Sequence, residues 1–423
     1  MSKNRYVILL LIVMAFVVCG CGRNGESTRA AGPVDVVFWN GFTGPDGTTM
    51  ERIVRSFNHD HPNIRVKMQI IPWATYYDKL TLGLAYGGAP DVFILHVNRF
   101  PEYAYYNSLN CTDDLVAKGG LDANDFVQVA WKAGLWHGKR YAVPLDCHPI
   151  GLYYNVDLFK KAGIVDQNGN ALPPVNLAEF LQDAKKLTKD TNGDGRPDQW
   201  GFAFTWLRTN SYTFLGQFGT GLLDKDSRRA DINSSQAKKA MGLMADLVTK
   251  YKVCPSPEGQ DAWMGFQTGK VAMAMEGVYM LASLEDQKGL HFAGAVCPMF
   301  GKKHAVWAGS HLMVMPRSIT SEKRKAAWEF ITYLSDHSIE WAKGGQVPVR
   351  KSILDSAEFK KLPVQYQFSK ELPYVVYEPP VVPYNQIVPF ADAAFEAVLM
   401  HVKPANDALD ECARRVDKVM NRQ

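Results

Sequence analysis

The sequence predicts an α/β protein made of two lobes joined by a hinge of several crossing segments. Short apolar runs alternate with helical patterns along the chain, which is typical of α/β folds. Near the middle, residues 141–155 read YAVPLDCHPIGLYYN, where Pro144 and Pro149 favour extended backbone. We interpret this stretch as a crossing between the lobes that presents Asp146 and aromatic rings to the gap. An ordinary loop with a solvated aspartate is the alternative.

The composition is that of an ordinary globular protein. The chain has 423 residues, of which 47% are hydrophobic and 21% charged, and it is long enough for two domains. Removing residues 1–20 would take away Lys3 and Arg5 and no acid, so the formal charge would fall from +4 to +2. Nucleic-acid binding needs clustered positive charge, so we expect no nucleic-acid partner.

The amino-terminal end predicts export. Lys3 and Arg5 precede an apolar run over residues 6–18, which is shorter than the roughly twenty residues of a membrane-spanning helix. The segment VCGC that follows resembles a bacterial lipobox, which would make Cys21 the lipidated first residue of the mature chain. A plain secretory signal or a short anchor is the alternative. We expect a lipoprotein signal peptide over residues 1–20 and a flexible tether over residues 21–33.

The first half predicts strands that end in polar residues. Residues 34–39 read VDVVFW, a buried strand, and a loop rich in glycine and proline leads from it to a helix capped by Thr48 or Thr49. Further strands are expected over 64–71 and 89–95, with a helix over 77–84 between them. Ligands of open α/β sheets bind at the carboxyl ends of strands. The loop brings Asn40, Thr43 and Asp46 to that edge.

The second half predicts a further set of strands and amphipathic helices. Asn176 and Glu179 fit a capping box at the start of one helix. Residues 271–276 alternate large and small side chains, which predicts a strand that places Glu276 and Gly277 at a strand–helix junction. Other expected elements are helices over 237–251, 327–334 and 405–420, a return to the first lobe over 305–315, and no regular structure over the proline-rich residues 372–389.

An ordered series of motifs then gives a specific resemblance. FWNGFTGPDG, FNHDHPNIRV, GGAPDV and YAVPLDCHPIGLYYNVDLFKKAGI are followed by DTNGDGRPDQWGF, FQTGKVAMAMEGVYML, WAGSHLMVMP and VPVRKS, from about Val34 to about Ser352. This series resembles the extracellular solute-binding proteins of carbohydrate ABC importers, above all the maltose-binding-like group. The resemblance implies a periplasmic-binding-protein-like fold that closes on a sugar, without catalysis, and presents it to a membrane permease.

The resemblance also implies the domain boundaries and the location. We expect one lobe from residues 34–145 plus 310–348, and the other from residues 146–309 plus 349–423. The protein would be exported and held by its lipid at the outer face of the cytoplasmic membrane or in the periplasm. We expect a monomer that requires no cofactor.

Binding a sugar needs polar groups for its hydroxyls and aromatic rings for its C–H faces. By the resemblance, Asp146, Glu276 and Trp307 come first, and glycines would let the sugar approach the backbone. Each carboxylate could instead be a surface charge or a helix cap, and each tryptophan could pack in the core. The full set of candidate ligand-binding residues is Asn40, Thr43, Asp46, Asp91, Asp146, Trp206, Glu276, Gly277, Tyr279, Trp307, Gly309 and Arg350.

A calcium site is a further candidate. Asp190, Asn192, Asp194 and Asp198 stand at positions 1, 3, 5 and 9 of a calcium-binding loop. Position 12 is Gly201, where a bidentate glutamate would be expected. A structural calcium ion and a metal-free turn rich in Asx residues both remain open.

Two alternatives to sugar capture stay open. A secreted glycan-cleaving hydrolase would use two of Asp91, Asp146 and Glu276 as acid and as nucleophile or base. A binder of a sugar phosphate or a peptide would keep the fold and want more basic residues in the cleft. The five cysteines after Cys21 show no zinc-type spacing, and we expect buried free thiols, although up to two disulfides could form.

Overall fold

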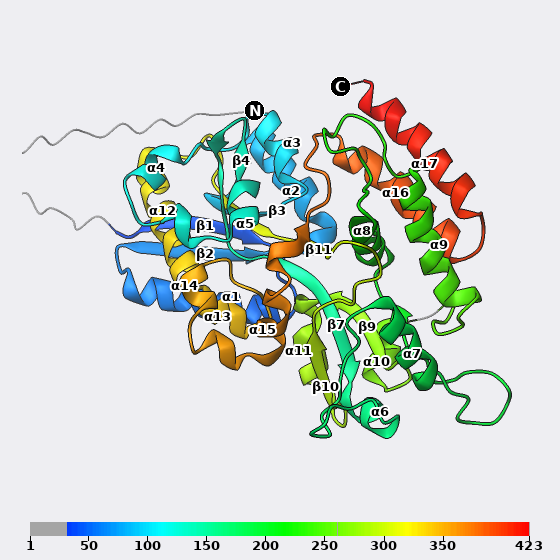
Figure 1. Ribbon diagram of the computed structural model, residues 1–423. Coiled ribbons are helices and arrows are strands. Elements are labelled where there is room, and N and C mark those ends of the chain that lie inside the picture. Colours follow the sequence, from blue (N-terminus) through cyan, green and yellow to red (C-terminus); the bar gives the residue numbers. More distant parts are fainter. Residues whose placement is uncertain (1–31, 260, 423) are drawn as a thin grey trace, which may run out of the picture.

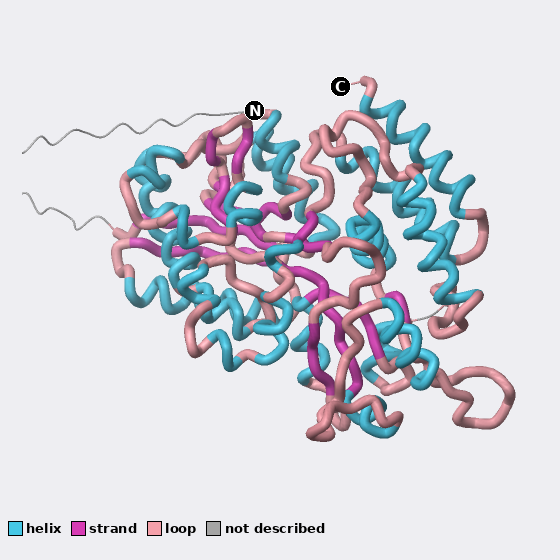
Figure 2. The backbone as a smooth tube through the Cα atoms, viewed as in Figure 1, coloured by secondary structure: helices cyan, strands magenta, loops and turns pink. Residues whose placement is uncertain are grey.

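The computed structural model describes residues 32–259 and 261–422, which form the two predicted lobes (Figure 1). Each lobe has its own mixed sheet, and helices surround the strands in both (Figure 2). The predicted signal peptide, most of the tether and Cys21 lie outside the described residues. Within the described part of the chain, no helix is both long and apolar enough to cross a bilayer.

The first lobe is built on a five-stranded sheet with the order β2-β1-β3-β12-β6. Strands β1, β2 and β3 are parallel, whereas β12 runs antiparallel to both β3 and β6. Side chains alternate between two cores: Met313 of β12 packs on one face, and Leu312 and Val314 pack on the other. The strands are β1 (Val34–Asn40), β2 (Ile64–Ile70), β3 (Val92–His96), β6 (Ala142–Pro144) and β12 (His311–Val314).

Helices cover both faces of this sheet. Helix α1 (Pro45–Asp60) buries Met50, Ile53 and Phe57 at helical spacing. It begins at Pro45, before the predicted threonine cap, because proline at the first helical position needs no N–H partner. The other helices of this lobe are α2 (Trp73–Tyr86), α3 (Phe100–Tyr105), α4 (Asp113–Ala117), η1 (Ala123–Asp125), α5 (Gln128–Ala133), α12 (Ser321–Asp336), α13 (Ser338–Lys343) and α14 (Lys351–Leu354), with a small hairpin of β4 (Leu135–Trp136) and β5 (Lys139–Arg140).

The second lobe is built around β7, whose eight residues are all buried. Its sheet has the order β13-β11-β7-β9-β8, and β10 pairs with β7 as well. The predicted strand at 271–276 is confirmed as β9. The strands are β7 (His148–Asn155), β8 (Ala203–Phe204), β9 (Met273–Gly277), β10 (Phe292–Ala295), β11 (Val306–Gly309) and β13 (Val375–Val376).

Helices pack around this second sheet. The Asn176 side chain accepts a hydrogen bond from the backbone N–H of Glu179, as the predicted capping box requires. The helices are α6 (Val156–Lys161), α7 (Leu177–Leu187), α8 (Leu207–Phe218), α9 (Ser235–Thr249), α10 (Ala262–Gln267), η2 (Val278–Met280), α11 (Leu281–Glu285), η3 (Phe359–Lys361), α15 (Pro363–Ser369), η4 (Leu372–Tyr374), α16 (Tyr384–Leu399) and α17 (Ala405–Met420).

Two sequence-based expectations about the carboxyl-terminal third are wrong. Helix α16 starts at Tyr384 and contains Pro389, although no regular structure was expected there. It buries Ile387 and Ala391 and packs against α8, α9 and α17, which outweighs the cost of an internal proline. In addition, residues 349–352 stay on the first lobe, because the Val349 carbonyl accepts from Val127 and the backbone N–H of Ser352 donates to Asp125.

Two chain crossings between the lobes lie side by side. Residues 145–147 connect β6 of the first sheet to β7 of the second, and Ser310 connects β11 back to β12. The Ser310 hydroxyl donates to the backbone carbonyl of Asp146, and Asp146 forms a β-bridge with Pro348. Residues 141–155, which the sequence analysis interpreted as a crossing, are therefore part of the connection between the lobes. They bring Asp146 to the gap between the lobes.

Candidate functional site

A cavity of about 480 Å³ lies between the two lobes. The first lobe contributes residues that follow β1 and β3 or belong to α2, and the second contributes residues at the ends of β9 and β11 and on α16. The cavity thus lies at the edge where the strands end, as expected for this fold class. Its lining residues are Asp46, Trp73, Tyr77, His96, Val97, Asn98, Arg99, His148, Trp206, Arg208, Tyr279, Trp307, Ala308, Gly309, His311, Gln346, Glu378, Tyr384, Asn385 and Val388.

Five of the sequence-predicted residues line this cavity: Asp46, Trp206, Tyr279, Trp307 and Gly309. The rings of Trp206 and Trp307 meet edge to face, with centroids 5.9 Å apart. Trp206 remains 43% exposed, so its ring is accessible to a ligand. Burial raises the pKa of the Asp46 carboxyl, which caps its own loop by accepting from the N–H of Gly44 and Gly47.

Glu276 and Gly277 lie directly behind the cavity wall. The Glu276 carboxylate accepts from the Tyr279 hydroxyl at 2.9 Å and from the N–H of Gly277 at 2.8 Å, and burial raises its pKa. A Cβ on Gly277 would lie 1.9 Å from the Tyr279 ring. Glu276 therefore holds Tyr279 in place, and the missing side chain of Gly277 makes room for that ring, whereas the sequence suggested room for a ligand.

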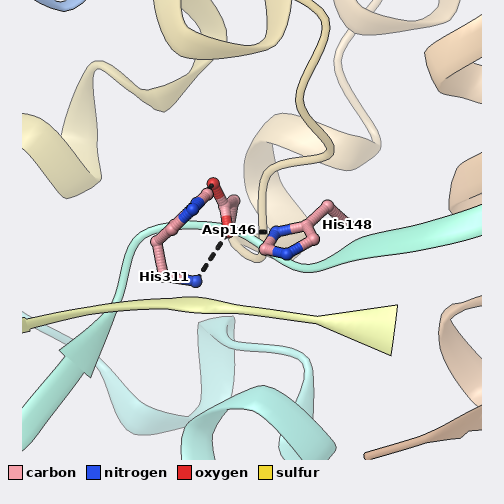
Figure 3. Close-up of side chains that lie close together, drawn as sticks. All are labelled: Asp146, His148 and His311. Atoms are coloured by element: carbon pink, nitrogen blue, oxygen red, sulfur yellow. Dashed lines mark hydrogen bonds and ion pairs between the residues drawn. The ribbon is translucent and has the colours of Figure 1, made fainter. Parts of the chain in front are cut away.

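Asp146 also lies one layer behind the cavity, at the centre of a buried network (Figure 3). Its two carboxylate oxygens contact Nδ1 of His148 at 3.2 Å and Nδ1 of His311 at 2.7 Å, and the Trp341 indole N–H donates to it at 2.7 Å. Burial alone would raise the pKa of Asp146, but its contacts with His311 and His148 hold that pKa well below its ordinary value. Asp146, one of the three residues ranked first from the sequence, therefore anchors two cavity-lining imidazoles.

The imidazoles themselves were missed by the sequence analysis. His96, His148 and His311 all line the cavity, and burial lowers the pKa of both His96 and His148. His148 is seated against Gly309, where a Cβ would come within 2.1 Å of its Nε2 atom. Each histidine stands at the end of a strand, which is the signal that could have identified them.

Other residues missed by the sequence analysis are aromatic or polar. Trp73 and Tyr77 occupy the first turns of α2, where the sequence pattern indicated only helix. Glu378 and Tyr384 come from the proline-rich segment, which carries no periodic pattern. Burial raises the pKa of Glu378. Asn98 donates to its carboxylate, whereas Tyr384 and Trp307 face it without a hydrogen bond of good geometry.

Four predicted residues do not reach the cavity. Asn40 is buried and accepts from the N–H of Phe42, while Thr43 is exposed on the loop. Asp91 accepts from the N–H of Val37 and from the Lys323 ammonium, both at 2.8 Å, so it fixes the entrance of β3. Arg350 is paired with Asp125 and Asp336 on the first lobe. Asn40, Asp91 and Arg350 therefore use their polar groups in contacts within the first lobe.

The three carboxylates considered for a hydrolase are therefore not brought together at the cavity. Asp91 is bound by a lysine on the first lobe, Asp146 is fully buried behind two histidines, and Glu276 is bound to a tyrosine. A glycosidase needs two carboxyl groups that flank one scissile bond. These three carboxylates do not provide that pair.

The Asp190 loop is exposed, and its carboxylates accept hydrogen bonds from backbone N–H groups of the loop itself. Asp190 accepts from the N–H of Gly193 and Gly195, Asp194 accepts from that of Arg196, and Asp198 accepts from that of Thr191. Gly201, at position 12 of the motif, is buried with its Cα against Ala184. The loop is thus held as a series of Asx turns, and calcium binding by it stays a prediction.

The cysteines in the described part of the chain are free thiols. Cys147, Cys254, Cys297 and Cys412 are buried, and Cys111 is half-buried. This agrees with the expectation of small hydrophobic residues packed in the cores.

Polar atoms without a partner concentrate at the cavity wall. Among the described residues, buried side-chain atoms that lack a hydrogen bond include Asn98 Oδ1, Arg99 Nε, Trp307 Nε1, the Tyr384 hydroxyl and both amide atoms of Gln346, all from residues that line the cavity. Buried polar groups normally find partners. The residues of the wall therefore carry unsatisfied donors and acceptors, next to several aromatic rings.

Comparisons with known proteins agree with this architecture. The family model described as bacterial extracellular solute-binding protein matches residues 42–339. An arabinooligosaccharide-binding protein of Bacillus subtilis is 23% identical over 376 residues, which cover 84% of this chain and 82% of that protein.

Solved structures show the same fold. The sugar-binding protein MalE from Xanthomonas citri has a TM-score of 0.79 at 23% identity, covering 92% of this chain and 98% of the other. UgpB from Mycobacterium tuberculosis, solved with glycerophosphocholine, also has a TM-score of 0.79, at 21% identity and with 93% and 99% coverage.

Proposed function

The chain belongs to the bacterial extracellular solute-binding proteins, and on this premise we propose that it captures a sugar, with an oligosaccharide as the expected ligand, and delivers it to an ABC permease. The observation that carries the proposal is the cavity wall between the lobes, which combines aromatic rings with polar side chains, several of which have atoms without a partner. Aromatic faces pack on the C–H faces of a sugar, and the polar groups exchange hydrogen bonds with its hydroxyls.

The charges around the cavity favour a neutral ligand over a sugar phosphate. Arg208 forms a two-bond ion pair with Asp392, and Arg99 lies 3.4 Å from Glu102. Asp46 and Glu378 add carboxyl groups to the wall. Both arginines are therefore already paired with acids, and a phosphate would have to compete with these partners.

We further propose that the protein binds its sugar without cleaving it. The family consists of binding proteins, and the three carboxylates considered for hydrolysis are engaged by scaffold residues. A ligand that binds between the two lobes stabilises the closed arrangement only to the extent that it binds the closed form more tightly than the open form.

One experiment tests capture and cleavage together. Purified protein is titrated with maltose, maltotriose, arabinotriose and sn-glycerol 3-phosphate while its melting temperature and the reducing ends in solution are measured. We expect a shift of several degrees with at least one neutral oligosaccharide, a smaller shift with the phosphate and no new reducing ends. New reducing ends would contradict the binding function, and a shift with the phosphate alone would contradict the sugar assignment.

We propose that the mature protein is a monomer tethered to the membrane through lipid on Cys21, at the outer face of the cytoplasmic membrane or in the periplasm. The lipobox-like segment and the polar stretch that follows it support this proposal. Loss of labelled fatty acid from a Cys21→Ala variant, with release of the protein from membranes, is the expected result.

A further inference from the structure

Three imidazoles gather at one wall of the cavity. The ring centroids of His148 and His311 are 4.6 Å apart, and His96 lies 5.0 Å from His311 and 6.4 Å from His148. They come from the ends of β3, β7 and β12, so both lobes contribute. Sugar recognition by aromatic rings and polar groups does not by itself require three histidines in one place.

Each imidazole is held through the same ring nitrogen. A carboxylate can only accept hydrogen bonds, so Asp146 requires a proton on Nδ1 of both His148 and His311. Nδ1 of His96 lies 2.6 Å from the Tyr77 hydroxyl. Among the described residues, the Nε2 atoms of these three rings have no hydrogen-bond partner. In neutral His148 and His311, whose Nδ1–H donates to Asp146, the free lone pair is on Nε2, whereas the Tyr77 hydroxyl accepts from the backbone N–H of His96 and can donate to Nδ1 of that ring.

We infer that His148 and His311, with His96 beside them, form a binding site for a divalent transition-metal ion such as Zn²⁺ or Ni²⁺ at this wall of the cavity. A carboxylate bonded to the far nitrogen of a histidine is the usual support of a metal-binding imidazole, because it fixes the tautomer and the ring orientation. Here Asp146 supports two histidines at once (Figure 3). Imidazole ligands favour zinc, nickel and copper over magnesium and calcium.

The spacing of the rings fits such an ion. A metal that lies 2.0–2.1 Å from two imidazole nitrogens at a tetrahedral angle places the ring centres roughly 5 Å apart. The His148–His311 separation of 4.6 Å and the His96–His311 separation of 5.0 Å are close to this value. The His96–His148 separation of 6.4 Å is wider, and the group whose ligand atoms lie within 4.8 Å of one another consists of Asp146, His148 and His311, without His96.

The surroundings supply further oxygen ligands and a rigid frame. Asp46 and His311 line the same cavity, and hydroxyls of a bound sugar would complete the coordination. Trp73 stacks parallel to the His311 ring, and Phe42 meets that ring edge to face at 4.9 Å. Gly309 provides the space in which His148 sits. The metal would therefore share the cavity with the ligand.

The test is a metal titration in the absence of sugar. Mature protein is stripped with EDTA and titrated with Zn²⁺ against a chromophoric zinc indicator. We expect one ion per chain, and we expect His148→Gln and His311→Gln each to weaken binding at least tenfold. His59→Gln is the matched control, because His59 is an exposed histidine that also contacts an aspartate, Asp60. It should bind zinc as the wild type does.

Three results would overturn the site: no one-to-one uptake by the wild type, retained uptake in both glutamine variants, or an equal loss in the control. If the glutamine variants do not fold, the site is tested instead by modifying the histidines of the wild type with diethyl pyrocarbonate, with and without zinc. Zinc should shield His148 and His311 but not His59, and equal modification of all three would overturn the site as well. The titration contains no sugar, so its outcome is independent of the proposed function.

Discussion

At the scale of single residues, several predicted ligand contacts turn out to be supports for the groups that line the cavity. Asp146 holds His148 and His311, and Glu276 holds Tyr279. Sequence patterns locate such residues because they stand at strand ends, yet they do not show which side chain of a neighbouring pair faces the cavity. Gly277 shows the same ambiguity, since a glycine can admit either a ligand or a neighbouring ring.

The role of Gly277 gives a direct prediction. In Gly277→Ala the new Cβ would lie 1.9 Å from the Tyr279 ring, so the ring must move away from Glu276. We expect the free energy of unfolding to fall by about 1–3 kcal/mol, as for other overpacked sites, and the affinity for the sugar to fall with it. Calorimetry and chemical denaturation measure the two effects.

Gly242→Ala is the matched control for this change. Gly242 lies inside helix α9, and a Cβ added there would have no atom within 4 Å, so alanine should raise the stability by about 0.5–1 kcal/mol. Its sugar affinity should match that of the wild type. Equal behaviour of the two variants would show that the Tyr279 contact does not determine the effect at Gly277.

At the scale of secondary-structure elements, prediction succeeds where the local pattern and the tertiary packing agree. The amphipathic stripes of α7, α9 and α17 and the alternation in β9 all mark real elements. The pattern fails for α16, where prolines masked a helix stabilised by burial against three other helices. Glu378 and Tyr384, just before and at the start of that helix, were missed for the same reason.

Helix α7 carries a buried acid that makes its stability depend on pH. Asp183 is 8% exposed, and burial raises its pKa to about 6. The folded state therefore favours the protonated form. The contribution of Asp183 to the free energy of unfolding is therefore fully present at pH values below about 4, its ordinary pKa. This contribution is lost as the pH rises to about 6.

Asp183→Asn should remove this dependence. We expect the variant to be more stable than the wild type by about 1 kcal/mol at pH 7.5 and equally stable at pH 3.5, because the carboxyl group is neutral there. Urea denaturation at both pH values measures the difference. The control Asp226→Asn changes an exposed acid and should show no such difference between the two pH values. A variant that is less stable than the wild type at pH 7.5 would contradict the prediction.

At the scale of the whole molecule, the lobes are joined by adjacent crossings and also by contacts across the mouth of the cavity. Asn98 of the first lobe donates to Glu378 of the second, and Asn385 of α16 donates to Glu102 of α3 at 2.8 Å. The order of motifs along the chain predicted the two lobes and the crossing at Asp146. It could not predict these contacts, because each joins residues about 280 positions apart.

The Asn385–Glu102 contact lets closure be tested at a residue, Glu102, that does not itself line the cavity. Glu102→Ala removes one hydrogen bond between the lobes, which is worth about 0.5–1.5 kcal/mol, and also frees Arg99 from its acidic neighbour. If the bond stabilises the closed arrangement, ligand affinity should fall by up to about tenfold. The radius of gyration from X-ray scattering of the ligand-free protein should rise.

Glu51→Ala, which breaks an exposed pair with Arg55 on α1, should leave both quantities unchanged. Unchanged affinity and radius in Glu102→Ala would show that this contact does not bias the lobes, and closure would then depend on the ligand and the crossings alone.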